Sequence, residues 1–308
     1  MVIITMKSIQ QNIINSLTND SELVGKAWHR LPELNKILKG FREGELTVLS
    51  GKTGTGKTTF LSEYSLDLAE NSGVRTLWGS FEVSITKLSK IMLTQFAGKS
   101  LKKDEEAITY YMEKFKSIPM FFIQTEGREN FKEIFQEMRA AYREHKIDHI
   151  ILDNLQFMVG QIGSTSNDKF HAQDHFVGQL RNFVNETNVH LSLIAHPRKE
   201  NNKEELSSDS LYGGCKLAQE SDNILLLQTI ESQNRKYLQV VKNRHDGGLG
   251  SMTLKFKSDS LSFGTSLSKT KDSSRKTPLI SQGNGNSKQD QNNSSNSDTN
   301  YNIQKAFG

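Results

Sequence analysis

The chain has almost no cysteine, no long apolar run and no large excess of one charge. Its single cysteine, Cys215, excludes an intramolecular disulfide and any metal site built from several cysteines. No apolar run approaches the ~20 residues that a membrane-spanning helix needs, which argues against an integral membrane protein. The 39 basic and 35 acidic residues leave a net charge of +4, which permits an anionic partner without requiring one.

A long stretch near the end of the chain lacks aromatic side chains. None lies between Phe263 and Tyr301, where Ser, Asn, Lys and Gln dominate. Such a stretch buries too little apolar surface to offset the entropy lost on ordering, so we predict a disordered tail over residues 265–308.

The first 25 residues have a different pattern. Four apolar residues recur at helical spacing and predict one short amphipathic helix within residues 1–25: Ile9, Ile13, Ile14 and Leu17. We expect this helix to dock on its own domain or on a neighbouring subunit. The first seventeen residues carry one lysine and no arginine, so they form no clear signal or transit peptide.

Residues 26–264 alternate strand-like apolar runs with helical stretches, which predicts one α/β domain with a mainly parallel sheet flanked by helices. The predicted strands are residues 46–50, 74–78, 119–124, 147–153, 189–195, 224–228 and 237–242. One sheet of this size indicates a single catalytic core.

Residues 51–58 read GKTGTGKT and fit the phosphate-binding P-loop pattern G-x-x-x-x-G-K-[ST]. They follow a predicted strand and precede a predicted helix, which favours a P-loop over a chance match in a glycine-rich turn. Lys57 is expected to reach the β- and γ-phosphates, and the Thr58 hydroxyl to bind Mg²⁺. The predicted nucleotide-binding residues here are Gly51, Lys52, Thr53, Gly54, Thr55, Gly56, Lys57, Thr58 and Thr59.

Two carboxylates are candidates to complete this site. Asp153 ends the apolar strand IILD and is the expected second Mg²⁺ ligand, whereas Asp148 precedes that strand and would lie at its wrong end. Glu82 follows another strand and is the expected base that activates water. The alternative for Glu82 is an ordinary surface glutamate.

Several longer strings are more specific than the P-loop: WGSFE, DNLQFM and HPRKE. The string VVKNRHDG follows them later in the domain. From about Trp28 to Phe263 the chain resembles the helicase domain of the Twinkle family, the mitochondrial replicative DNA helicases related to phage primase-helicases and bacterial DnaB. That family places a primase-like domain before the helicase, where this chain has one short helix.

The resemblance implies a RecA-like core and an ATP-driven homo-oligomeric ring, usually a hexamer, that moves 5′ to 3′ along one DNA strand. It implies ATP and Mg²⁺ as cofactors and single-stranded and forked duplex DNA as partners. It also implies single-stranded DNA-binding protein and polymerase as further partners, and the mitochondrial matrix and its nucleoid as location.

The resemblance also implies roles for residues beyond the P-loop. His196 matches a γ-phosphate sensor, and Arg244, assisted by Lys242, matches an arginine that enters the neighbouring subunit's site. Phe256 matches the position that stacks on the nucleotide base. The alternatives are a satisfied histidine at the core edge, a surface arginine paired with an aspartate, and a strand-end core aromatic, respectively.

DNA is expected on two loops, residues 160–168 ending at Lys169 and residues 198–212. The expected DNA-binding residues are Lys169, Arg198, Lys199 and Lys203. Acidic neighbours offset the second loop's positive charge, so a solvated mixed-charge loop is the alternative. In the same region Cys215 is expected to be a small packing residue.

Two other functions fit the same motifs. One is a RecA-like recombination or strand-annealing ATPase that coats single-stranded DNA without unwinding it. The other is a non-unwinding regulatory subunit that joins larger rings.

Overall fold

The computed structural model describes residues 4–18, 24–124, 131–154, 156, 166–197, 206–207, 211, 214–230 and 235–264. The chain divides into two units, Met1–Lys269 and Thr270–Gly308, and every described residue belongs to the first. The predicted disordered tail, residues 265–308, lies outside the described residues.

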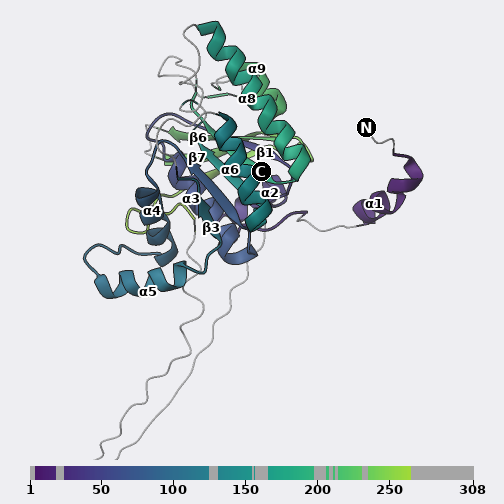
Figure 1. Cartoon of the computed structure of the whole chain (residues 1–308). Coiled ribbons are helices and arrows are strands. Elements are labelled where there is room, and N and C mark those ends of the chain that lie inside the picture. Colours follow the sequence, from purple (N-terminus) through teal and green to yellow (C-terminus); the bar gives the residue numbers. More distant parts are fainter. Residues whose placement is uncertain are drawn as a thin grey trace, which may run out of the picture. The chain divides into compact units, whose positions relative to one another are not determined.

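One eight-stranded sheet organises the domain, with the strand order β3-β2-β4-β5-β1-β6-β7-β8. Figure 1 shows the sheet with helices packed around it. Strands β1 to β6 are parallel, and β7 and β8 are antiparallel additions at one edge. The strands are β1 (Leu46–Ser50), β2 (Thr76–Ser80), β3 (Met120–Phe122), β4 (His149–Asp153), β5 (His190–Ala195), β6 (Asn223–Ile230), β7 (Arg235–Asn243) and β8 (Gly250–Leu254).

All seven strands predicted from the sequence are present, with ends shifted by a residue or two. Strand β8 was missed because only Met252 and Leu254 of its residues are buried apolar side chains, too few to form a recognisable run. The expected mainly parallel α/β sheet is confirmed.

Helices cover both faces of the sheet. The helices on one face are α2 (Pro32–Leu38), α3 (Lys57–Ser72) and α4 (Ile85–Ala97), and those on the other are α6 (Phe131–His145), α8 (Ser166–Thr187) and α9 (Gly214–Glu220). Strand β4 shows why both layers are needed. Ile150 and Leu152 pack into one apolar cluster and Ile151 into the other, because successive strand side chains point to opposite faces.

Two further helices complete the described chain. Helix α5 (Glu105–Phe115) packs against α4 through a small apolar cluster that includes Leu93 and Tyr111. Helix α1 (Met6–Thr18) is the helix expected within residues 1–25. Its docking on a neighbouring subunit stays a prediction. Among the described helices none is long and apolar enough to cross a membrane.

The parallel register gives the sheet two chemically different edges. At the carboxyl edge, Ser50 of β1 leads into the P-loop, and Ser80 of β2 lies opposite Asp153 of β4. At the amino edge, Asn223 begins β6 beside Asn243, which ends antiparallel β7. Ligands of open α/β sheets bind at the carboxyl edge, so the P-loop and the two predicted carboxylates meet where a ligand is expected.

Candidate nucleotide-binding site

The P-loop turns tightly between β1 and α3. Gly54 and Gly56 have φ angles of +82° and +99°, a region that residues with side chains rarely adopt. A Cβ atom on Gly51 would lie only 2.4 Å from the backbone oxygen of Leu227. Helix α3 begins at Lys57, so its first N–H groups and the positive end of its dipole face the loop. This geometry suits an anionic phosphate chain.

Lys57 is buried and turns back onto its own loop. Its Nζ donates to the backbone oxygens of Gly51 at 2.8 Å and Lys52 at 3.1 Å. Burial lowers the pKa of Lys57, and the charges of Asp153 and Glu82 oppose that shift. The amino group therefore lies beside the loop, close to two carboxylates and in reach of phosphate oxygens.

Thr58 and Asp153 lie in direct contact although 95 positions separate them in the sequence. Thr58 Oγ1 donates to Asp153 Oδ2 at 2.6 Å. Asp153 is 1% exposed, and no described residue donates a hydrogen bond to its Oδ1. Burial chiefly, and then the charge of Glu82, raise the pKa of Asp153 to about 6, against the Thr58 hydrogen bond and the Lys57 charge.

A free carboxylate oxygen beside a hydroxyl fits Mg²⁺, which prefers oxygen ligands and keeps several waters and phosphate oxygens of its own. The competing carboxylate, Asp148, lies at the other end of β4, where it forms an ion pair with Arg75 at 2.9 Å. Asp153 is therefore the carboxylate of β4 that is placed to reach a metal at the P-loop.

Glu82 and His196, predicted separately from the sequence, meet through Asn154. Asn154 Nδ2 donates to Glu82 Oε2 and lies 3.1 Å from His196 Nε2, and that nitrogen is 3.6 Å from Glu82 Oε2. Burial and the charge of Lys57 lower the pKa of His196, which favours the neutral ring. Glu82 itself is half exposed, as a group that activates water must be.

Asn154 and Gln156 are site residues that the sequence reasoning did not select. Gln156 Oε1 accepts from the His196 backbone N–H at 3.1 Å, and Gln156 Nε2 donates to the His196 oxygen at 3.4 Å. The available signal was their position in the DNLQ string directly after Asp153. Gln156 precedes the first predicted DNA loop and His196 precedes the second. These contacts therefore connect the chain segments that lead into the two loops.

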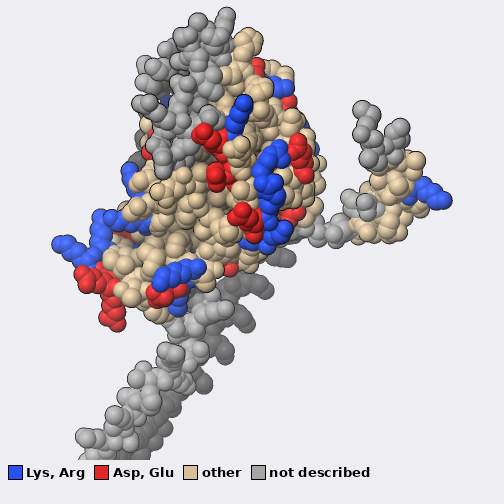
Figure 2. All heavy atoms as spheres, in the orientation of Figure 1, with Lys and Arg blue, Asp and Glu red and all other residues tan. Residues whose placement is uncertain are grey.

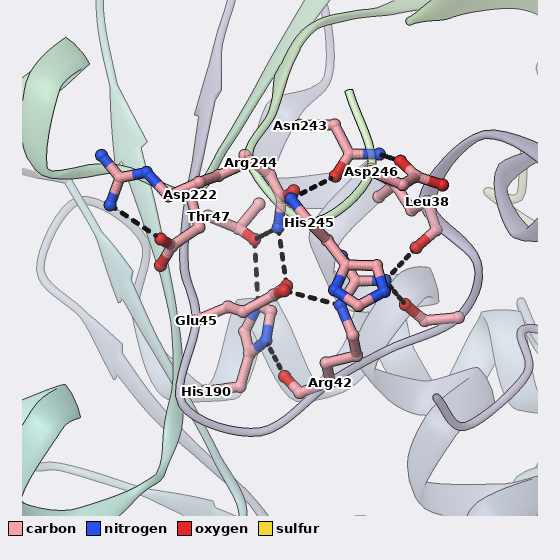
Figure 3. A network of polar contacts seen from close by, with 12 residues as sticks. Leu38, Arg42, Glu45, Thr47, His190, Asp222, Asn243, Arg244, His245 and Asp246 are labelled. Atoms are coloured by element: carbon pink, nitrogen blue, oxygen red, sulfur yellow. Dashed lines mark hydrogen bonds and ion pairs between the residues drawn. The ribbon is translucent and has the colours of Figure 1, made fainter. Parts of the chain in front are cut away.

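Arg244 and Lys242 lie at the amino edge of the sheet, away from the P-loop of their own chain. Figure 3 shows Arg244 beside Asp222 at this edge. Arg244 Nη1 is 3.0 Å from Asp222 Oδ1, so the described chain shows the alternative arrangement, an arginine paired with an aspartate. Lys242 Nζ donates to backbone oxygens at the end of α9, those of Ala218 and Ser221, both at 2.6 Å. Neither side chain contacts the nucleotide site of its own chain.

Phe256 is 43% exposed and lies just beyond β8. This exposure does not fit the alternative role for Phe256, that of a core aromatic at the end of a strand. Its ring centroid is 5.1 Å from that of Phe263, which is buried against Phe60 of α3. This pairing leaves one exposed aromatic surface on the P-loop side of the domain.

The predicted DNA contacts are mostly outside the described residues. Arg198, Lys199 and Lys203 fall there, and Lys169 lies in the first turn of α8 without a described side chain. On the face drawn in Figure 2, acidic side chains lie beside the basic ones. Cys215 is exposed on α9, so its expected packing role is wrong.

A strand, P-loop and helix beside a buried aspartate, on a sheet of this order, define a P-loop nucleoside-triphosphatase domain of RecA-like fold. The family model described as AAA domain matches residues 16–202, more than half of the chain. The chain belongs to this nucleotide-binding family.

The chain is similar to curated replication proteins of a phage and a bacterium. A "DNA helicase/primase" of Enterobacteria phage T3 is 23% identical over 267 residues, 80% of this chain and 47% of the relative. A "Probable plasmid replicative DNA helicase" of Chlamydia trachomatis is 23% identical over 223 residues, 70% of this chain and 49% of the relative. The chain spans about half the length of these curated relatives.

Solved structures show the same fold. "ATPase Domain of G40P" matches with a TM-score of 0.74 and 14% identity, covering 85% of this chain and 99% of that one. A DnaB-like replicative helicase, solved for its interactions with primase, matches with a TM-score of 0.72 and 13% identity over 86% of this chain and 67% of that one. These comparisons confirm the DnaB-like and phage helicase-primase part of the resemblance and do not support the Twinkle branch in particular.

Proposed function

We propose that this chain is the motor domain of a replicative DNA helicase, which hydrolyses ATP with Mg²⁺ and unwinds duplex DNA as a ring. The relatives named above are helicases, and their names supply the substrate class. The observation that carries the proposal is the contact between Asn154, Gln156 and His196, because it joins the hydrolytic site to the starts of both predicted DNA loops.

Each side chain of the site has a role that follows from its position. Thr58 and Asp153 would hold Mg²⁺, which would neutralise charge on the β- and γ-phosphates. Lys57 leaves the carbonyls of Gly51 and Lys52 for the phosphate oxygens. Glu82 orients the attacking water and takes its proton.

The Glu82–Asn154–His196 contacts supply the coupling between ATP and DNA. Loss of the γ-phosphate changes the hydrogen-bond partners available to Glu82 and His196. Because Gln156 binds both the N–H and the carbonyl of His196, any shift of His196 reaches the chain segments that lead into residues 157–165 and 198–205. A ring repeats these weak loop contacts in every subunit, which multiplies their grip on DNA.

The position of Arg244 favours a ring over a monomer. It lies at the edge of the sheet opposite its own P-loop, so it can serve a nucleotide only in a second copy of the chain. The predicted homo-hexamer places such a copy beside each subunit. We therefore propose that Arg244, with Lys242 beside it, completes the site of its neighbour and stabilises charge on the γ-phosphate.

A strand-displacement assay tests the proposal. The full chain is mixed with ATP and Mg²⁺ and with forked duplexes that carry either a 5′ or a 3′ single-stranded tail. We expect displacement that requires ATP and the 5′ tail, and none with Glu82→Gln. A protein that hydrolyses ATP on single-stranded DNA without displacing a strand would instead be a recombination or annealing ATPase.

A regulatory ring subunit is the remaining alternative. It would join rings but hydrolyse no ATP on its own. The joint presence of Lys57, Glu82, Asp153 and Arg244 favours an active enzyme, since an inactive subunit has no need of all four. The ATPase rate of the wild-type chain with single-stranded DNA separates these possibilities directly.

The finer assignments rest on the resemblance to Twinkle. They are mitochondrial location in the matrix and nucleoid, 5′-to-3′ polarity, and partnership with single-stranded DNA-binding protein and polymerase. Microscopy of a tagged chain tests the location, and the two forked substrates test the polarity.

A further inference from the structure

Lys236 of β7 joins three parts of the domain that are far apart in the sequence. Its Nζ donates to the backbone oxygen of Thr55, in the P-loop, at 2.6 Å. The same nitrogen lies 5.7 Å from the ring centroid of Phe256 and 5.8 Å from that of Phe263. A single ammonium group therefore bridges the P-loop and the aromatic pair that follows β8.

The surroundings of Lys236 are unusual for a lysine. It is partly buried, and no carboxylate of the described residues forms an ion pair with it. Burial lowers its pKa. Removing an ammonium group from water without a counter-ion is costly, and here the Thr55 carbonyl and the two ring faces provide the compensation. A lysine held in this way has a fixed position.

The P-loop and the aromatic pair are closely packed around this contact. A Cβ atom on Gly56 would lie 3.3 Å from Phe263 Cζ and 3.8 Å from Lys236 Nζ. Phe263 is 6% exposed, whereas Phe256 is 43% exposed. Phe263 is thus the buried support and Phe256 the ring that a ligand can reach.

We propose that Lys236 is a positioning residue that holds Phe256 beside the P-loop as a platform for the base of the bound nucleotide. This inference rests on the proposed nucleotide site. A triphosphate bound by the P-loop directs its nucleoside away from the loop, and an exposed ring next to the loop offers that base a stacking surface. Without the Lys236 contacts, Phe256 would have to be ordered at the moment of binding, which weakens affinity.

The proposal predicts a selective loss, because Lys236 serves the nucleoside and Lys57 serves the phosphates. Calorimetry on the full chain with Mg²⁺ compares ATP with inorganic tripolyphosphate, which has the phosphates and no base. Lys236→Ala and Lys236→Met should weaken ATP binding by roughly three- to tenfold, the worth of one hydrogen bond and one or two cation–π contacts. Tripolyphosphate binding should stay unchanged.

Two further variants separate positioning from general support of the fold. Lys236→Arg keeps a cationic donor and should recover most of the ATP affinity. Lys255→Ala removes an exposed lysine of the neighbouring segment and should bind both ligands as the wild type does. In the background of Phe256→Ala, Lys236→Ala should cause little additional loss, since its target ring is gone.

The results that overturn the inference are distinct from those that overturn the proposed function. Equal weakening of ATP and tripolyphosphate by Lys236→Ala would mean that the lysine only supports the P-loop. Unchanged ATP binding, or additive losses with Phe256→Ala, would also reject it. A wild-type chain that binds neither ligand would overturn the nucleotide site itself.

Discussion

The guanidinium of Arg244 lies 3.0 Å from the carboxylate of Asp222, at the edge of the sheet opposite the P-loop of the same chain (Figure 3). Asp222 also accepts from Arg181 at 2.5 Å and from the Leu46 N–H at 2.8 Å, so the carboxylate is held from three sides. Arg244 is half exposed and Asp222 almost buried. This arrangement holds Arg244 at the surface, where a neighbouring subunit can reach it.

Arg244→Ala should bind ATP normally and hydrolyse it about 10³-fold more slowly, the typical loss for an arginine that enters a neighbour's site. Mixed with Lys57→Ala protein, it should regain partial activity. Some interfaces in mixed rings pair an intact P-loop with an intact arginine. ATPase assays over a range of mixing ratios measure this recovery.

The matched control for this experiment is Arg139→Ala, which removes a surface arginine paired with Glu186 on the far side of the sheet from α3. It should be fully active alone. If Arg244→Ala and Lys57→Ala subunits assemble together without regaining activity, Arg244 either acts on the nucleotide of its own chain or only supports the fold.

Lys57→Ala should abolish ATP hydrolysis and leave the fold intact, because the hydrogen bonds of its Nζ go to the loop carbonyls of Gly51 and Lys52 and its charge serves the phosphates. Circular dichroism checks the fold and phosphate release checks the activity. Near-normal hydrolysis by this variant would reject the P-loop assignment.

Glu82→Gln should keep nucleotide affinity while turnover falls by orders of magnitude. The amide keeps the side chain's volume and a hydrogen-bonding oxygen for Asn154, but it cannot accept a proton from water. Equilibrium binding and single-turnover hydrolysis separate the two effects. A parallel loss of binding would show that Glu82 has a structural or metal-binding role.

Deletion of residues 1–20 removes helix α1 and should weaken the ring while the domain stays folded. The apolar residues of α1 include Leu17, which is 81% exposed, and a neighbouring subunit can cover this surface. Light scattering compares this variant with one that lacks residues 270–308, which should assemble normally. An unchanged oligomer would mean that α1 packs on its own chain or on nothing.

His149 should make the free energy of unfolding depend on pH. Its ring is fully buried between Phe41 and His190, and burial lowers its pKa well below the usual 6.5. The folded chain resists protonation while the unfolded chain accepts it. The contribution of His149 to stability is therefore full above pH 6.5 and declines as pH falls below it, by up to about 1.4 kcal/mol per pH unit.

Urea unfolding between pH 5 and 8 measures this slope, and His149→Gln provides the comparison. The variant should lose the His149 contribution to the slope below pH 6.5. His190, whose pKa burial also lowers, contributes in the same direction, and Asp153, whose pKa burial raises to about 6, contributes in the opposite one. Equal slopes in the two proteins would show that His149 does not contribute.

Much of the fold was predictable because its signals are local. Five-residue apolar strands such as β1 and β4 are buried on both faces, and a parallel sheet with two helical layers is the structure that requires this. Strand β8 escaped prediction because its burial comes from packing beside β7 and not from its own composition.

The residues around the hydrolytic site were predictable only in part. Glu82 and His196 each follow a strand, which local pattern reveals, but their common partner Asn154 emerges only when β2, β4 and β5 lie side by side. The same holds for Lys236, whose sequence neighbours give no sign of the P-loop carbonyl that it binds.

Local sequence was enough to predict the P-loop, the strand-end carboxylates and the parallel sheet, because each depends on residues close together in the chain and on a repeating apolar pattern. Long-range packing, by contrast, brings together side chains that are far apart in the sequence, such as Thr58 with Asp153 and Lys236 with Thr55. It also turns Arg244 away from the nucleotide site of its own chain. Strand order and direction set these distances, and no local pattern encodes them.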